Sequence, residues 1–296
     1  MTLTPTRLWP DSATIIDRSR SVFFARWEEL LRLRRFVTKA SNADDIYELR
    51  VALRRFRAAL DLLCPFVPKG PKGGKEPKTE LRKNVRTFKR ILGGLRTIDK
   101  AQRFFQSRIT TDSFANTNLL HALSELRNKE LKRTGKALRA FDHHHLDRIV
   151  RELVGGINVV TITEKNSISL LSYFSEVSIR QYMPIHQLQL GATAPGQRVL
   201  RHALHNAIKK WGYFFEIISQ TLDRDYKQTL DLIKEYQGLL GRMNDIAVLE
   251  VLISHLKLPP DERKRAEDAL RAEDTLLLNE FSELIEQKPL TYTFLI

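Results

Sequence analysis

Residues 46–61 of the chain read Ile46-Tyr47-Glu48-Leu49-Arg50-Val51-Ala52-Leu53-Arg54-Arg55-Phe56-Arg57-Ala58-Ala59-Leu60-Asp61. At 3.6 residues per turn, the apolar side chains form one stripe of a helix, made by Leu49, Leu53, Phe56, Leu60 and Leu63. Arg50, Arg54 and Arg57 form a second row along the flank of that stripe. Like charges at this spacing repel by a few tenths of a kcal/mol. The row therefore favours an anionic ligand that runs along the helix, and a solvated charged face is the simpler alternative.

The same pattern recurs 155 residues later. Tyr47 then aligns with His202, Arg50 with His205, Arg54 and Arg55 with Lys209 and Lys210, and Arg57 with Gly212. A second match follows, in which residues 92–99 align with residues 240–247 at an offset of 148. Two matches in the same order at nearly the same offset predict an internal duplication. We expect an N-terminal half at residues 14–155 and a C-terminal half at residues 167–287.

These motifs resemble the CHAD family, the conserved histidine α-helical domain. Residues 50–57 fit the first family motif closely, and residues 239–249 resemble the second-half signature. The sequence departs from the family where Tyr47 replaces a histidine and where His205 and Gly212 replace arginines. The resemblance implies an all-α fold of two four-helix bundles, related by a pseudo-twofold duplication and enclosing a central basic channel. It also implies binding of inorganic polyphosphate.

The stripes and the resemblance together predict a set of polyphosphate-binding side chains. They are Arg50, Arg54, Arg55, Arg57, Lys89, Arg96, Arg198, His202, His205, Lys209, Lys210 and Arg242. On the far side of the helix at 80–107, Lys83, Arg86 and Arg90 should face only solvent. Since histidine ordinarily titrates near pH 6.5, we expect His202 and His205 to gain protons and binding to tighten between about pH 7.5 and about pH 6.

The charge of the chain independently indicates a polyanionic partner. The net charge is +14, and the pI is about 9.9. Such a balance suits nucleic acid, an acidic membrane surface or a phosphate polymer. Nucleic-acid binding on the same surface is therefore the main rival, and a scaffold that recruits acidic proteins is another. Aromatic residues make up 8%, too few to argue for rows of base-stacking platforms. The sequence gives no indication of oligomeric state.

No motif of an enzyme is present. The chain lacks a phosphate-binding P-loop, a Gly-x-Ser-x-Gly turn and a His-Glu-x-x-His pair. Asp99 and Asp245 lie near arginines, and we expect them to hold basic side chains by charge-assisted hydrogen bonds. We predict neither catalysis nor a cofactor nor a metal. The consecutive His143, His144 and His145 point in different directions on a helix and suit a polar surface turn better than a metal site.

Location follows from cysteine content and hydropathy. The single Cys64 excludes an intramolecular disulfide and is typical of a reducing compartment. No run of 18 apolar residues is present, so we expect no membrane span. We therefore expect a cytoplasmic protein, and the predicted ligand adds polyphosphate granules as a place where it would gather.

Periodicity and turn residues predict the order of the elements. We expect helices at 14–39, 46–64, 80–107, 117–140, 167–190, 195–220, 224–255 and 260–287. Residues 66–79 carry four lysines and read as a loop, either a solvated connector or an arm that closes on an anion. Residues 155–166 break the helical pattern; Val159–Ile162 can be extended, but one short strand makes no sheet. The apolar tail from Pro289 should pack on the core.

Overall fold

The computed structural model describes residues 9–39, 43–64, 76–108, 118–140, 142–157, 160–163 and 166–294. Within these ranges the chain is helical apart from one short hairpin, which confirms the all-α prediction. The helices are α1 (Ser12–Lys39), α2 (Ala43–Leu63), α3 (Pro77–Gln106), α4 (Asn118–Arg139), α5 (His143–Gly155), α6 (Leu170–Leu188), α7 (Arg198–Leu222), α8 (Lys227–His255) and α9 (Pro260–Gln287), with a 3-10 turn at Gly191–Thr193.

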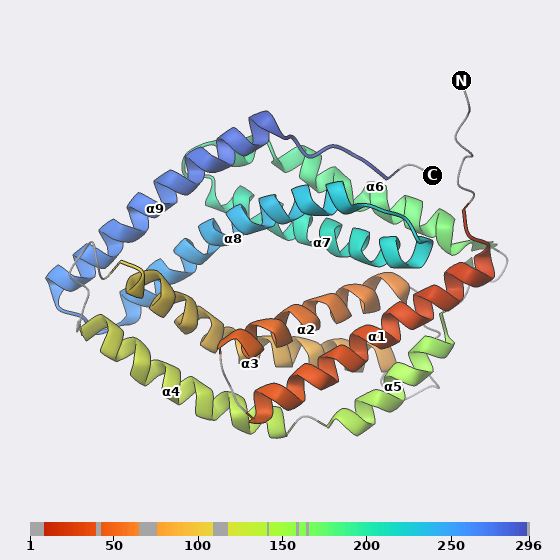
Figure 1. Cartoon of the computed structure of the whole chain (residues 1–296), viewed down its shortest axis with the longest axis horizontal. Coiled ribbons are helices and arrows are strands. Elements are labelled where there is room, and N and C mark those ends of the chain that lie inside the picture. Colours follow the sequence, from red (N-terminus) through yellow and green to blue (C-terminus); the bar gives the residue numbers. More distant parts are fainter. Residues whose placement is uncertain are drawn as a thin grey trace.

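The helices form two groups along the chain (Figure 1). In the first group α1 packs along α2, and α3 packs on α4; in the second, α8 packs against both α7 and α9. The groups meet where α2 contacts α7, α3 contacts α8, and α1 contacts α6 and α7. The helices that carry the sequence motifs therefore lie next to one another in the middle of the molecule.

The apolar stripe of α2 is buried as predicted. Leu49, Leu53, Phe56 and Leu60 are each at most 1% exposed. The ring of Phe56 packs against two aromatic rings of α1, with centroids 5.4 Å from Phe23 and 5.2 Å from Trp27. Burying that many large side chains stabilises the fold by several kcal/mol. It also fixes the rotation of α2, so that the arginine row stands half-buried at the edge of the stripe.

Among the described residues, the first group has five helices instead of the four that we expected. The additional helix, α5, begins at the three histidines that we predicted to form a surface turn. Asp142 caps it, because its carboxylate accepts a hydrogen bond of 3.1 Å from the backbone N–H of His145. The buried residues Leu146, Ile149, Val150 and Leu153 follow at helical spacing. The cap and this spacing are the signals that we overlooked.

The connections also differ from the prediction. Strands β1 (Val160–Thr163) and β2 (Asn166–Ile168) pair antiparallel, although we expected no sheet there. Helix α3 already begins at Pro77, since proline is well tolerated in the first turn of a helix. Lys78 is buried, and its amine donates a hydrogen bond to the backbone carbonyl of Cys64. The proposed arm at 66–79 lies largely outside the described residues. The tail packs as expected, with Phe294 buried.

Candidate functional site

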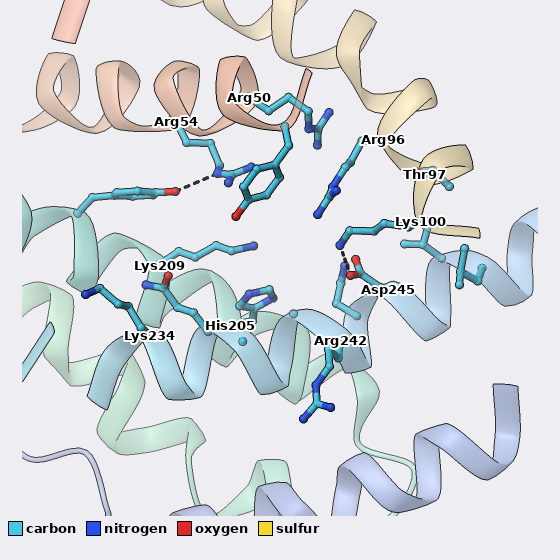
Figure 2. A pocket seen from close by; sticks show the side chains of 18 residues that line it. Arg50, Arg54, Arg96, Thr97, Lys100, His205, Lys209, Lys234, Arg242 and Asp245 are labelled. Carbon is cyan, nitrogen blue, oxygen red and sulfur yellow. Dashed lines mark hydrogen bonds and ion pairs between the residues drawn. The ribbon is translucent and has the colours of Figure 1, made fainter. Parts of the chain in front are cut away.

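A basic cleft of about 640 Å³ opens between α2 and α3 on one side and α7 and α8 on the other (Figure 2). Seven cationic side chains line it: Arg50 and Arg54 from α2, Arg96 and Lys100 from α3, Lys209 from α7, and Lys234 and Arg242 from α8. Among its described lining residues Asp245 is the one carboxylate. The cleft therefore carries a large excess of positive charge.

Burial and mutual repulsion act on these cations together. Burial, followed by the neighbouring charges of Arg54 and Arg96, lowers the pKa of Arg50 to about 10. Burial and then the Arg54 charge lower the pKa of Lys209 to about 8. Burial likewise lowers the pKa of Arg96. A pKa below its usual value means that the charged form is disfavoured in the free protein. An anion in the cleft would relieve that cost.

Two carboxylates hold basic side chains, as the sequence predicted. Asp245 forms an ion pair with Lys100 inside the cleft. Asp99 is 4% exposed and accepts a hydrogen bond of 2.7 Å from Nε of Arg127, a residue of α4. Hydrogen bonds between charged partners are stronger than neutral ones, so each pair fixes the position of its cation. Asp99 therefore links α3 to α4 outside the cleft, whereas Asp245 lines the cleft itself.

His205 lies at the bottom of the cleft and stays neutral there. Its side chain is 4% exposed, and Nε2 has no hydrogen-bond partner among the described residues. Burial, then the charges of Lys209 and other nearby cations, lower its pKa to about 3. Our expectation that His205 gains a proton between pH 7.5 and 6 is therefore wrong for the free protein. A neutral imidazole can still offer one N–H to a ligand.

Two tyrosines in the cleft are engaged with arginines. The Tyr47 ring lies 4.6 Å from the guanidinium carbon of Arg96, a cation–π distance. The hydroxyl of Tyr213 accepts a hydrogen bond of 2.9 Å from Nε of Arg54. Tyr47 thus replaces the histidine of the family motif with a ring that positions a cation. Sequence reasoning missed Tyr213, which no periodic pattern marks.

A second cavity of about 520 Å³ adjoins the first. Both cavities are lined by Arg54, Lys209 and Tyr213, so the Arg54–Tyr213 hydrogen bond stands between them. The predicted residues Arg57, Lys89 and Lys210 line this second cavity. Arg86 lines it as well, although we expected Arg86 to face only solvent. The predicted stripe therefore extends over two adjoining cavities.

Other predicted residues lie elsewhere or are already paired. Arg55 donates a hydrogen bond of 3.0 Å to Glu216. Arg198 pairs with both Glu250 and Asp274. Arg198 and His202 line a separate, smaller cavity of about 270 Å³. Arg242 lines the basic cleft but forms an ion pair of 2.5 Å with Glu280. Carboxylates thus pair with three of the predicted arginines, which are Arg55, Arg198 and Arg242.

Close packing explains why Gly212 has no side chain. A Cβ atom there would lie 2.5 Å from the amide nitrogen of Gln237 and 2.9 Å from a methyl carbon of Ile233. Both distances are shorter than real contacts allow. Where α2 carries the aligned Arg57, α7 therefore has a glycine that allows a close approach to α8.

Lys100 and Lys234 are cationic lining residues that sequence reasoning missed. Lys100 follows Arg96 by four residues on the same face of α3, so helical spacing could have found it. Lys234 lies on α8 and already pairs with Asp231 at 2.8 Å. No pattern on α8 distinguished Lys234 from its solvent-facing neighbours.

The described residues hold neither a cluster of metal ligands nor a membrane-spanning helix. They contain no group of three or more His, Cys, Asp or Glu side chains placed to hold a metal ion. Of the three consecutive histidines, His145 instead pairs with Glu80 at 2.9 Å. In the same part of the chain, no helix has the length and apolar character needed to cross a membrane.

Comparison with known proteins identifies the family. The CHAD domain matches residues 21–254, so the chain belongs to the CHAD family. This family is associated with polyphosphate binding, and its domain is generally a binding domain. No curated protein matches the sequence.

Two solved structures show the same fold. The crystal structure of the CHAD domain from the plant Ricinus communis is 15% identical, with a TM-score of 0.66 over 99% of this chain and 98% of that one. PptA from Streptomyces chartreusis is 12% identical, with a TM-score of 0.65 over 94% of this chain and 98% of that one. The similarity of fold therefore extends over nearly the whole chain.

Proposed function

We propose that this protein binds inorganic polyphosphate in the basic cleft and does not cleave it. One observation carries the proposal: Arg50, Arg54, Arg96 and Lys209 converge on one cleft and form no ion pair with any described carboxylate. Cations that are half-buried and unpaired need an anion from outside. The association of the family with polyphosphate names that anion.

The chemistry of the lining suits a phosphate chain. A guanidinium donates two parallel hydrogen bonds to phosphate oxygens, and a lysine adds a compact positive charge. A polyphosphate carries about one charge per phosphate and no bases. The two tyrosines of the cleft are held by Arg96 and Arg54, so they are not free platforms for stacking. These features favour polyphosphate over single-stranded nucleic acid.

Binding without cleavage follows from the scarcity of carboxylates. Enzymes that cleave phosphate chains generally use several acidic side chains to hold metal ions. Among the described lining residues of the cleft, Asp245 is the only acid, and Lys100 already pairs with it. The adjoining cavity, with Arg57, Lys89 and Lys210, would take further phosphates. We therefore expect long chains to bind better than short ones.

A competition assay tests the proposal. Labelled long-chain polyphosphate is titrated into the protein in about 0.15 M salt, and unlabelled polyphosphate, single-stranded RNA or DNA of equal total charge is added. We expect polyphosphate to compete best, and its affinity to fall steeply with salt as counterions are released. Equal or better competition by RNA or DNA would favour nucleic-acid binding and would contradict the proposal.

The organisation and the location belong to the same proposal. Halves at 14–155 and 167–287, related by duplication, are supported by the contacts of α2 with α7 and of α3 with α8. A cytoplasmic protein with this ligand would gather at polyphosphate granules. A fluorescent fusion examined in cells with and without polyphosphate would test that location, since the pattern should be diffuse when the polymer is missing.

A further inference from the structure

The amine of Lys209 differs from the other lysines of the cleft. It lies in the middle of the lining, at the position shared with the second cavity (Figure 2). Within the described part of the chain it forms no hydrogen bond or ion pair, whereas Lys100 is paired with Asp245. Lys83 of α3, by contrast, is exposed and lines neither of the two cavities. Lys209 therefore combines an unpaired amine with a confined, cation-rich site.

The groups that face Lys209 come from three packed helices. They are Arg54 of α2, Lys89 and Lys100 of α3, and Asp245 of α8, and His205 precedes it by one turn on α7. Burial is the main cause of its lowered pKa of about 8, and the cations add to it against the opposing effect of Asp245. At pH 7.5 roughly a quarter of such amines are neutral, compared with roughly one in a thousand for an ordinary lysine. The neutral amine is the nucleophile.

We propose that Lys209 is a covalent modification site, acylated without a second enzyme by small acyl phosphates that the surrounding cations recruit. The phosphate group of such a molecule carries the charge that Arg50, Arg54 and Arg96 favour. Its acyl carbon would then lie within reach of the one unpaired amine of the described lysines in the cleft. This inference rests on the geometry of the cleft and does not require that polyphosphate be the resident ligand.

The reaction is a simple acyl transfer. The lone pair of the neutral Nζ attacks the carbonyl carbon and forms a C–N bond. The bond from that carbon to the bridging oxygen breaks, and orthophosphate leaves with its electron pair. The nitrogen loses its proton to water or to the departing phosphate. Nothing is oxidised or reduced, and the cations that bound the phosphate also stabilise the leaving group.

Acylation would change the cleft at a sensitive point. An amide carries no charge, so the modified protein has one cation fewer where the two cavities meet. The acyl group also occupies space beside the Arg54–Tyr213 hydrogen bond. Polyanion binding should therefore weaken in the modified protein.

The test measures the acylation rate of each lysine. The full chain is incubated with acetyl phosphate at pH 7.5, and the modified fraction at each site is followed by mass spectrometry after digestion. We expect Lys209 to react at least about tenfold faster than Lys83, because much of its amine is neutral at this pH and the surrounding cations hold the phosphate beside it. Equal rates at the two lysines would overturn the proposal. The readout is covalent mass, so it does not depend on whether polyphosphate binds.

Two further measurements separate recruitment from simple reactivity. The N-hydroxysuccinimide ester of acetic acid transfers the same acyl group without a phosphate. The preference for Lys209 over Lys83 should be several-fold larger with acetyl phosphate, and an equal preference would overturn the role of the cations. The rate at Lys209 should also level off above about pH 8. A rate at Lys209 that keeps rising tenfold per pH unit above about pH 9 would contradict the proposal.

A variant tests whether Arg54 helps to bring acetyl phosphate to Lys209. Arg54→Gln removes the largest cationic influence on Lys209 and one of the proposed phosphate contacts. In a variant that circular dichroism shows to be folded, acylation of Lys209 by acetyl phosphate should slow several-fold and that of Lys83 should not change. An unchanged rate at Lys209 would count against recruitment. Unfolding wild-type protein in urea gives a second control, in which the difference between the two lysines should disappear.

Discussion

Two rows of side chains that align in the sequence, one on α2 and one on α7, differ in kind. On α2 the row holds three guanidiniums, those of Arg50, Arg54 and Arg57. At the aligned positions α7 has His205, which is neutral, Lys209, whose pKa is about 8, and Gly212, which has no side chain. One face of the site therefore supplies permanent charge, and the other supplies groups that respond to their surroundings.

The largest effect should come from neutralising the α2 row. In Arg50/Arg54/Arg57→Gln we expect polyphosphate affinity to fall roughly a hundredfold, since each arginine contributes on the order of 1 kcal/mol of direct phosphate contact. Isothermal titration calorimetry on folded protein gives the Kd.

The matched control for that variant is Lys83/Arg90/Lys132→Gln. These three residues are exposed and line none of the described cavities, but they carry the same total charge. Their loss should weaken binding only through long-range attraction, by a few-fold, and should do so mainly at low salt. Equal losses in the two variants would show that net charge alone drives binding and that α2 has no special role.

Placing an arginine at position 212 of α7 should destabilise the protein and should not tighten polyphosphate binding. Gly212→Arg places a side chain against Gln237 and Ile233, where even a Cβ is too close. We expect the free energy of unfolding to fall by about 1–3 kcal/mol, as for other overpacked sites. Chemical denaturation measures this. Gly238→Ala, where a Cβ would meet nothing within 4 Å, is the control and should be neutral or slightly stabilising. Tighter polyphosphate binding by a fully stable Gly212→Arg protein would refute this explanation.

His205 should make stability depend on pH. Its pKa is about 3 in the folded protein and about 6.5 in the unfolded chain, so between these values the unfolded chain binds the proton. Stability from this residue is complete above about pH 6.5 and is lost as the pH falls towards 3. By pH 5 wild type should therefore have lost about 1–2 kcal/mol more of its free energy of unfolding than His205→Gln. Parallel pH curves for the two proteins would mean that His205 is not held neutral.

The smallest effect concerns Lys209 and the pH dependence of binding. As the pH rises from 7 to 9, the free protein loses the Lys209 proton, because burial and Arg54 have lowered its pKa to about 8. Affinity for polyphosphate should fall by several-fold over this range. In Lys209→Arg the charge is permanent, so the affinity should stay nearly constant. A wild-type affinity that does not change between pH 7 and 9 would show that this amine does not contact the ligand.

Much of this molecule could be predicted from local pattern. Helical spacing in residues 46–61 correctly identified the buried face of α2, because a helix that contacts a core must present its apolar residues at that spacing. The family, the all-α fold and several lining residues of the cleft follow from this stretch, its repeat and the second match at 92–99 and 240–247. Those lining residues are Arg50, Arg54, Arg96, His205, Lys209 and Arg242. The helix α5 could also have been predicted, because Asp142 is a suitable N-cap and apolar residues follow it at helical spacing. We instead interpreted the three consecutive histidines as a surface turn.

The ion pairs and pKa values could not be predicted from the sequence, because they depend on contacts between helices that are distant in the chain. Nothing local shows that Arg198 meets Glu250 and Asp274, or that Arg55 meets Glu216, because pairing is set by which helices pack together. The pKa values of His205 and Lys209 depend likewise on burial and on charges from other helices. A sequence states which charges a helix carries. Folding alone sets how much water each charge keeps and which partner it finds, and these two quantities decide which cations are left for a ligand.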